Sequence, residues 1–509
     1  MKLSLFTEEV CQKRSAKEIY LVGATVSYWQ ELCDEYDVLP RIAGAFASSP
    51  RNQGEKIFRG KKISVMLLAK INQLPSAALL IITDDYFAEV YETLKSYGED
   101  LGDIYYFVNQ DTAYYLAYKE KFKDSPLKNI LLFRSGPHAS AYIPGMDFAD
   151  NARALFEYML QQGWTDKYQF VWLVKNPQEY SARYQQYDQV NFLPWDGAVS
   201  EDIEVRESYY EALCLAKYIF FTDAYGFARH ARKDQIRVQL WHGCGIKGRA
   251  FFSPCENRYE YTTVIGDMYA RLHAKDYGLR AEQVLVTGYP KDDWLFHPCK
   301  NWQDKFHIPQ AAKYIFWLPT FRAAAVEGLA KLTVQEGTGE TGLPIVRSAA
   351  MLRELNSTLQ AQNVVLLIKL HPFQKREAVS AEAMSNIRFL ENEDLRRHDV
   401  QINELLGYAD ALISDYSSAA VDYTLLDRPI AFTLDDCEDY KNSRGFNWPN
   451  VLDYLPGEEI YDFADFLAFV SAVTEDRDLC REKRRKLRSL FHKYTDDQSA
   501  ARVVKILGL

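Results

Sequence analysis

The stretch Val364-Val-Leu-Leu-Ile-Lys-Leu-His-Pro372 is an apolar, strand-like run that ends in a histidine and a proline. A second run of this kind lies earlier in the chain, at Val238-Gln-Leu-Trp-His-Gly-Cys-Gly-Ile-Lys247. It places His242 before a glycine-rich loop. In an open α/β sheet, the carboxyl ends of the strands line the ligand crevice. An imidazole titrates near physiological pH, so it can take or give a proton there. The two stretches therefore predict an α/β fold with one cleft between two domains, and they make His242 and His371 the first candidates for catalysis.

The length and composition indicate a multidomain globular protein. The 509 residues correspond to about two to four domains, and a net charge of −10 argues against a general nucleic-acid-binding protein. The eight cysteines show no C-x-x-C spacing, so we expect reduced thiols in the cytoplasm. The sequence has no signal-peptide core and no apolar run of about 18 residues. We therefore expect any membrane contact to be peripheral, on the inner face of the cell membrane.

Residues 1–125 are predicted to form a small Rossmann-like α/β domain, because strand-like and helix-like segments alternate there. The turn at Gly23 lacks the G-x-G-x-x-G spacing, so dinucleotide binding is poorly supported. The segment resembles small Rossmann-like domains that precede some bacterial sugar-modifying enzymes. Serine or alanine replaces the aspartate that would hold a ribose, and a structural or docking role is therefore favoured over nucleotide binding. The predicted strands lie within 18–25, 40–46, 77–83 and 103–108.

Two further α/β blocks are predicted over 126–299 and 300–509. A helix over 150–160 is predicted to be capped by Asp150. The basic helix from Glu482 onward fits either contact with anionic lipid or a solvated helix, and the solvated helix is favoured. The predicted strands are 129–134, 169–174, 218–222, 237–241, 263–266 and 284–290 in the first block, and 314–319, 364–370, 387–390, 411–414 and 429–434 in the second.

Ser414-Asp-Tyr-Ser-Ser418 marks the end of a predicted strand and the start of a helix. Asp415 or Ser417 can cap this helix. Its free backbone N–H groups and the hydroxyls of Ser417 and Ser418 would then form an anion site, although an ordinary capped helix explains the spacing equally well. Asp422, one turn further along the same face, is a candidate acceptor for the hydroxyls of a ribose.

Three cations, Lys247, Arg322 and Lys369, also lie close to predicted strand ends. Singly, each is typical of a surface charge, but together they favour a diphosphate site, because phosphoryl transfer needs mainly positioning and charge stabilisation. Cys244 suggests a Cys/His nucleophile, which needs positive, partly exposed surroundings; a loop residue is the favoured interpretation. No D-x-D motif lies at a strand end in the two blocks, so neither a required metal nor a cofactor is expected.

Six motifs follow one another in a characteristic order. They are Trp-His-Gly-x-x-x-Lys (241–247), Gly-Tyr-Pro-Lys-x-Asp (288–293), Pro-Thr-Phe-Arg (319–322), Lys-Leu-His-Pro (369–372), Ser-Asp-Tyr-Ser-Ser-x-x-x-Asp (414–422) and Tyr-x-x-x-Arg-Gly (440–445). With these motifs, about residues 129–475 resemble the CDP-glycerol glycerophosphotransferase family, which includes teichoic acid primases and polymerases and related capsule enzymes. Residues 133–136 and Asp150-Asn151 are similar to the family's early F-x-S…D-N stretch. The chain departs at Cys244-Gly245, where Thr-Pro is common, and at Lys291, where arginine is common.

The resemblance implies a GT-B-like pair of facing Rossmann-like domains behind the small N-terminal domain. Residues 126–299 would form the acceptor side, and residues 300–509 the CDP-donor side with a C-terminal helix. The implied reaction transfers a polyol phosphate, with CDP-glycerol as the expected donor, to a hydroxyl of a lipid-linked or oligosaccharide acceptor. It releases CMP and forms a phosphodiester in a cell-surface polymer of the teichoic acid or capsule type. A CDP-ribitol-dependent transferase and a GT-B glycosyltransferase that uses a nucleotide sugar remain the alternatives.

The resemblance also implies roles for individual residues. His242 matches the family histidine proposed as general base, and a base that titrates near pH 7 suits this task. His371 matches the second family histidine and would stabilise the diphosphate and the leaving group. The implied donor-binding residues are Lys247, Arg322, Lys369, Ser417, Ser418, Asp422 and Arg444, with Asp422 on the ribose.

Overall fold

The protein is an α/β structure with three sheets among the residues that the computed structural model describes. These are residues 3–23, 26–48, 52–74, 78–84, 87–97, 101, 104–136, 145–222, 231–248, 259–320, 339–370, 384–443 and 445–509. The chain forms two compact units, one of residues 1–124 and 196–210 and the other of residues 125–195 and 211–509. The sequence had assigned 196–210 to the block after the first domain, whereas the structure groups this segment with the N-terminal residues.

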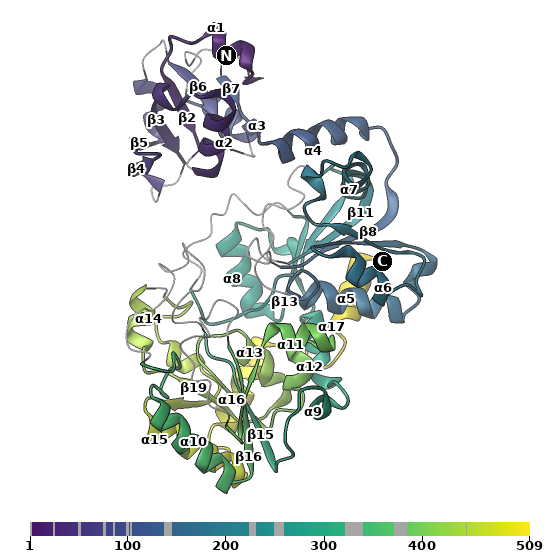
Figure 1. The fold of residues 1–509 in the computed structure, drawn as a ribbon, viewed down its shortest axis with the longest axis vertical. Coiled ribbons are helices and arrows are strands. Elements are labelled where there is room, and N and C mark those ends of the chain that lie inside the picture. Colours follow the sequence, from purple (N-terminus) through teal and green to yellow (C-terminus); the bar gives the residue numbers. More distant parts are fainter. Residues whose placement is uncertain are drawn as a thin grey trace. The chain divides into compact units, whose positions relative to one another are not determined.

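The first unit contains a seven-stranded sheet in the order β1-β7-β6-β2-β3-β5-β4 (Figure 1). Its edge pair β4–β5 is antiparallel and was missed in the sequence, because lysines interrupt its apolar pattern, as is typical of edge strands. Segment 196–210 joins this unit through Tyr210, whose hydroxyl lies 2.9 Å from the carbonyl oxygen of Asp111. The elements are β1 (Leu3–Leu5), α1 (Glu8–Lys13), β2 (Ile19–Val22), α2 (Val26–Tyr36), β3 (Ile42–Ala47), β4 (Gly54–Phe58), β5 (Lys61–Leu67), β6 (Leu79–Ile82), α3 (Phe87–Lys95), β7 (Ile104–Tyr106) and α4 (Gln110–Lys121).

The second unit begins with a seven-stranded parallel sheet in the order β10-β9-β8-β11-β12-β13-β14. Its central strands are continuous apolar runs because helices cover both faces; Phe133, Trp172 and Phe220 lie in one core under α5. Asp150 is the first residue of α5, with a left-handed backbone (φ 61°), and Ala149, not Asp150 as predicted, is the N-cap. The Oδ1 of Asp150 accepts the N–H of Asn151 at 2.8 Å. The elements are β8 (Lys128–Arg134), α5 (Asp150–Gln161), β9 (Gln169–Val174), α6 (Pro177–Arg183), β10 (Val190–Pro194), α7 (Ile203–Leu215), β11 (Ala216–Phe221), β12 (Ile236–Gln239), β13 (Tyr261–Val264), α8 (Asp267–Tyr277) and β14 (Val284–Val286).

The third sheet, also parallel, lies in the same unit and has the order β17-β16-β15-β18-β19-β20. Helices α10 and α15 pack on one face and α11, α12 and α13 on the other (Figure 1). The elements are α9 (Trp302–Lys305), β15 (Lys313–Trp317), α10 (Ala349–Ala361), β16 (Val364–Lys369), β17 (Ile387–Leu390), α11 (Asn392–His398), α12 (Ile402–Leu406), β18 (Ala411–Ser414), α13 (Ala419–Tyr423), β19 (Ile430–Thr433), α14 (Cys437–Ser443), β20 (Glu458–Ile460), α15 (Phe463–Thr474), α16 (Arg481–Phe491) and α17 (Ser499–Leu507).

The last two helices carry the chain from the third sheet back to the second. The ring of Phe491 at the end of α16 lies 6.0 Å from the ring of Tyr269 on α8. Val503 on α17 is fully buried in the core of the second sheet, and Figure 1 shows α17 beside α5. Asp293 accepts the backbone N–H groups of Ser499 and Ala500, each at 2.9 Å. The C-terminal helices therefore tie the two halves of the second unit together.

A set of ion pairs also joins these halves. Arg153 on α5 is 5% exposed, and its guanidinium lies 2.7 Å from Asp399 and 2.8 Å from Glu157. Arg396 on α11 lies 2.6 Å from Glu179 on α6. Breaking an ion pair of a buried guanidinium costs more free energy than breaking a surface pair, because water does not reach the buried charge. These ion pairs therefore hold α5 and α6 of the second sheet against α11 of the third sheet.

Candidate active site

His242 follows the carboxyl end of β12 and points its ring outward. Trp241 adopts a left-handed backbone (φ 60°), a conformation that is unusual for a bulky side chain. Its indole is 3% exposed, whereas the imidazole of His242 is exposed. The two rings stack with centroids 5.0 Å apart and planes 21° apart. The turn thus buries the tryptophan and leaves the imidazole of His242 exposed at the sheet edge.

The loop after His242 packs directly onto the start of α13 from the third sheet. A Cβ atom added to Gly243 would lie 2.3 Å from the Oγ of Ser418, so no larger residue fits without movement. The hydroxyl of Ser417 accepts the backbone N–H of Ala419 at 3.3 Å. Ser418 is the N-cap residue of α13, and its side chain makes no capping hydrogen bond. The glycine that follows His242 therefore packs against Ser418, and the membership of His242, Ser417 and Ser418 in one site stays a prediction.

Lys247 lies on the same junction. It forms an isolated antiparallel bridge with Phe446, and the N–H of Gly248 donates to the carbonyl of Gly445 at 2.9 Å. The side-chain amide of Asn447 donates to the carbonyl of Gly245 at 2.9 Å. These bonds hold the loop of the first half against the segment that follows α14 in the second half.

A buried ion pair lies beneath this surface. The Nζ of Lys291 is 2.6 Å from the Oδ2 of Asp422, and these residues are 8% and 1% exposed. Burial disfavours the charge of Lys291, but Asp422 and Asp292 outweigh this and raise its pKa. Burial and repulsion from Asp422 hold the pKa of Asp292 well above its usual range. Burial likewise raises the pKa of Asp150, against the opposing charges of Lys291 and His242.

The placement of Asp422 differs from the simple expectation of a ribose acceptor at the cleft surface. Its Oδ2 is engaged with Lys291, and its Oδ1 is a buried atom that no described group hydrogen-bonds. Contact with a ribose stays a prediction, and it would have to be made through Oδ1. Lys291 was noted in the sequence only as a departure from arginine; its pairing with Asp422 was missed, because nothing in the chain marks a contact over 131 residues.

Lys369 ends β16 at the carboxyl edge of the third sheet. Its Nζ donates to the carbonyl of Leu370 at 3.2 Å, and burial lowers its pKa to about 8. A cation at that edge suits an anionic ligand, because anions relieve the cost of burying the charge. Three other predicted site residues, His371, Arg322 and Arg444, lie outside the described residues.

Two neighbouring side chains have structural tasks. The carboxylate of Asp415 accepts both the N–H and the hydroxyl of Thr320, at 2.7 and 2.9 Å, and so holds the segment that follows β15. Of the two residues predicted to cap the helix, only Ser417 accepts a backbone N–H at the helix start. The thiol of Cys244 is fully buried, 3.0 Å from the hydroxyl of Tyr289. A nucleophilic thiolate needs access, so burial favours a packing role for Cys244.

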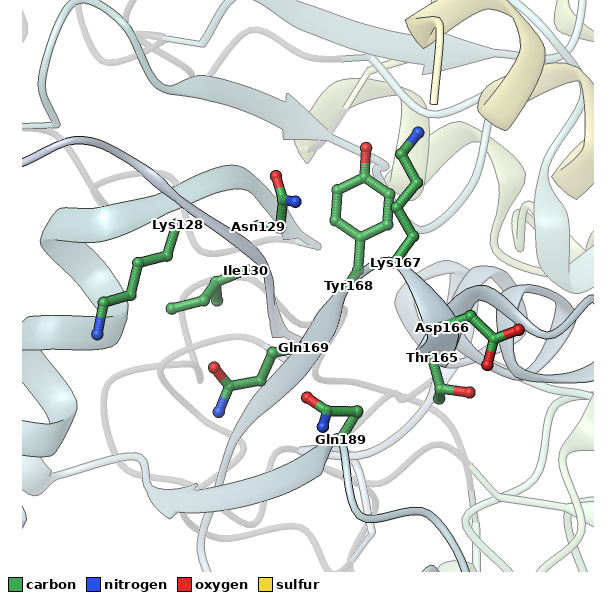
Figure 2. A pocket seen from close by; sticks show the side chains of 9 residues that line it. All are labelled: Lys128, Asn129, Ile130, Thr165, Asp166, Lys167, Tyr168, Gln169 and Gln189. Atoms are coloured by element: carbon green, nitrogen blue, oxygen red, sulfur yellow. The ribbon is translucent and has the colours of Figure 1, made fainter.

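Other features of the described residues lie away from this junction. A polar cavity of about 320 Å³ opens at the amino ends of β8 and β9, the sheet edge opposite to His242 (Figure 2). Over the described ranges, no cluster of three or more metal-binding side chains occurs. None of the helices in the described part of the chain is long and apolar enough to cross a membrane.

Comparisons with known proteins agree with the resemblance seen in the sequence. A family profile described as CDP-glycerol:poly(glycerophosphate) glycerophosphotransferase matches residues 139–508. The chain is 29% identical over 313 residues to the teichoic acid ribitol-phosphate polymerase TarK of Staphylococcus aureus, which covers 57% of this chain and 56% of TarK. It is 25% identical over 325 residues to a teichoic acid ribitol-phosphate primase of Bacillus spizizenii, covering 59% of this chain and 76% of the primase. The chain spans about half the length of the ribitol-phosphate polymerases that it matches.

A solved structure shares the fold. A variant of the wall teichoic acid polymerase TagF superposes with a TM-score of 0.59 at 17% identity, over 83% of this chain and 96% of that chain. This likeness confirms the predicted GT-B-like pair of Rossmann-like domains. Because the family profile covers well over half of the sequence, the chain belongs to the CDP-glycerol:poly(glycerophosphate) glycerophosphotransferase family, as its ordered motifs predicted.

Proposed function

We propose that the protein transfers a polyol phosphate from a CDP-polyol to an acceptor hydroxyl. The observation that carries this proposal is that His242 is exposed and that the next residue, Gly243, packs against Ser418 at the start of α13. A base from one sheet and an anion-binding helix start from the other are the two parts that such a transfer needs. Membership of the family supports the same reaction class.

In this mechanism, His242 accepts the proton of the acceptor hydroxyl as its oxygen attacks the phosphorus bonded to the polyol. The new phosphorus–oxygen bond forms while the bond to the bridging oxygen breaks, and CMP leaves with that electron pair. Ser417, Ser418, Lys247 and Lys369 would hold the phosphates, because hydrogen bonds to charged oxygens are strong. By resemblance, Arg322 and Arg444 would join them, and His371 would stabilise the leaving CMP.

The donor is proposed as CDP-glycerol or CDP-ribitol. Relatives of both kinds occur: the polymerases TarK and TarL are named for ribitol phosphate, and a primase of Bacillus subtilis, 26% identical over 248 residues, is named for glycerol phosphate. A TagF variant was solved after a soak with CDPG. The acceptor is proposed to be a lipid-linked or oligosaccharide chain, met by a cytoplasmic or peripheral enzyme at the inner face of the membrane.

The test is a donor panel. The full chain is incubated with CDP-glycerol, CDP-ribitol or a UDP-sugar, with a lipid-linked acceptor, and released nucleotide and product mass are measured. We expect CMP release and a product heavier by one polyol phosphate, also in the presence of EDTA, because we propose that the protein's own cations neutralise the diphosphate. Release of UDP alone would show a glycosyltransferase instead.

Two histidine variants, one at the proposed base and one as a control, test the role of His242 directly. His242→Ala is expected to lower the turnover number by about 10²–10⁴-fold, the contribution of a general base. His297→Ala is the matched control, because His297 is exposed in the same unit and pairs with Asp497 of the C-terminal segment. Wild-type turnover by a folded His242→Ala variant would refute the role of the base.

A further inference from the structure

The side chain of Asn151 holds the backbone immediately before His242. It is fully buried at the start of α5. Its Nδ2 donates to the carbonyl oxygens of Leu240 and Trp241 at 3.1 and 2.9 Å, and its Oδ1 accepts the N–H of Lys291 at 3.1 Å. An amide has two N–H donors and one carbonyl oxygen, so Asn151 uses both ends of its side chain on three backbone groups.

The carbonyl of Trp241 belongs to the peptide bond that enters His242, so its direction sets where the imidazole begins. Trp241 is held in a left-handed conformation that costs on the order of 1–3 kcal/mol and persists only where surrounding contacts enforce it. Those contacts are present: Asn151 binds both carbonyls, Gln239 accepts the N–H of Trp241 at 3.1 Å, and Thr263 donates to the carbonyl of Leu240 at 2.8 Å. Among these side chains, only Asn151 bonds the peptide bond of His242 itself.

Asn151 also connects the histidine to the opposite half of the unit. The backbone of Lys291 donates to Asn151, while the ammonium group of the same residue binds Asp422 on α13. That helix begins at Ser418, which the glycine after His242 touches. The buried amide of Asn151 thus fixes the loop of His242 relative to Lys291. Lys291 in turn binds α13, the helix that starts at the proposed phosphate-binding serines.

We propose that Asn151 is a positioning residue for catalysis: it acts through His242, without touching substrate, by enforcing the strained turn at Trp241. The proposal rests on the proposed role of His242 as the base. A base displaced by about 1 Å loses on the order of 10²-fold in rate. Donor binding at the helix start has no direct dependence on the amide of Asn151.

The test uses Asn151→Asp, which keeps the shape of the side chain but replaces both N–H donors by an oxygen that repels the two carbonyls. We expect the turnover number to fall by about 10²-fold, with the KM for the CDP-polyol unchanged. In the double variant with His242→Ala, Asn151→Asp should cause no further loss, because residues that act as one unit are not additive. A KM effect alone, wild-type turnover or an additive loss would overturn the proposal.

The matched control is Asn386→Asp. Asn386 also donates to a strand carbonyl, that of Val364 at 2.8 Å, but it lies at the amino end of β17, away from His242. It should lower stability without lowering the turnover number of the folded protein.

A second readout does not depend on turnover. Diethyl pyrocarbonate modifies accessible imidazoles, and mass spectrometry gives the rate at His242 and at His297 in the same sample. Asn151→Asp should change the rate at His242 and leave the rate at His297 unchanged; an unchanged rate at His242 refutes positioning. If the wild-type protein releases no CMP from either CDP-polyol, the proposed function fails, while the modification rates still decide whether Asn151 positions His242.

Discussion

The buried pair of Lys291 and Asp422 predicts that removing its cation costs more than removing its anion. The ammonium lies 2.6 Å from Asp422 and 3.8 Å from Asp292, and it also attracts the carboxylate of Asp150. One lysine thus serves three carboxylates that burial separates from water. Asp422→Asn leaves the lysine with two partners, whereas Lys291→Met removes the cation that all three carboxylates share.

The geometry gives the size of the difference. With an effective dielectric constant of about 20, a charge pair at 2.6 Å gains about 6 kcal/mol and one at 3.8 Å about 4 kcal/mol before the cost of burial is subtracted. Stripping a buried charge of its partner costs about 3–5 kcal/mol net, which we expect for Lys291→Met. Asp422→Asn loses one charge-assisted hydrogen bond, about 1.5–3 kcal/mol, and also relieves its repulsion of Asp292.

The deficit of Lys291→Met should depend on pH. Burial already raises the pKa values of Asp150 and Asp292 in the folded protein, and loss of the cation raises them further. A carboxyl group whose folded pKa exceeds its unfolded pKa destabilises the fold increasingly as pH rises from about 4. The variant should therefore be closer to the wild type at pH 5 than at pH 7.5.

Urea unfolding of the wild type and the variants, followed by fluorescence at both pH values, measures this. Lys313→Met is the matched control, because Lys313 pairs with the exposed Asp476 at 2.8 Å, and such surface pairs contribute about 0–1 kcal/mol. A larger loss for Asp422→Asn than for Lys291→Met, or a Lys291→Met deficit that is equal at both pH values, would refute the reasoning.

Three further predictions concern neighbouring groups. Burial lowers the pKa of Lys369 to about 8, so donor kcat/KM should fall as pH rises through that value and persist to higher pH in Lys369→Arg, measured by CMP release. Asp293 caps α17, and burial raises its pKa to about 6. Asp293→Ala should lower the free energy of unfolding by about 0.5–2 kcal/mol in urea titrations, and Asp293→Asn by less, because asparagine also caps. Gly243→Ala places a methyl group against Ser418 and should cost about 1–3 kcal/mol, with reduced turnover in the donor panel.

Most strands of the two sheets in the second unit could be predicted, because a strand that is buried on both faces is a continuous apolar run in the sequence. Residues 169–174, 387–390 and 411–414 are strands over the predicted ranges. The short edge strands β10 and β20 were missed, because three to five residues at a half-buried edge carry too little pattern. Segment 196–210 could not be assigned to the first unit either, since its contacts, such as Tyr210 with Asp111 and Glu207 with Lys121, join residues far apart in the sequence.

The candidate site divides in the same way. His242, Ser417 and Ser418 could be predicted as candidates because each follows a strand end, and parallel strands present those ends at one edge. The hydrogen bonds of Asn151 and the ion pair of Lys291 with Asp422 could not be predicted, because the partners are backbone groups and charges far away in the sequence. A buried asparagine or lysine leaves no periodic signal, and only the tertiary structure shows which groups it satisfies.

The surroundings of His242 also break several local rules at once. A tryptophan adopts a left-handed backbone, an aspartate does the same at the start of α5, a glycine admits a serine hydroxyl where no side chain fits, and a lysine is buried beneath them. The two left-handed residues strain the backbone, and such strain persists only where neighbouring contacts enforce it. Sequences depart from local consistency mainly where function requires it. Their convergence on one histidine is therefore an argument, independent of the family motifs, that the position of this imidazole is what the junction preserves.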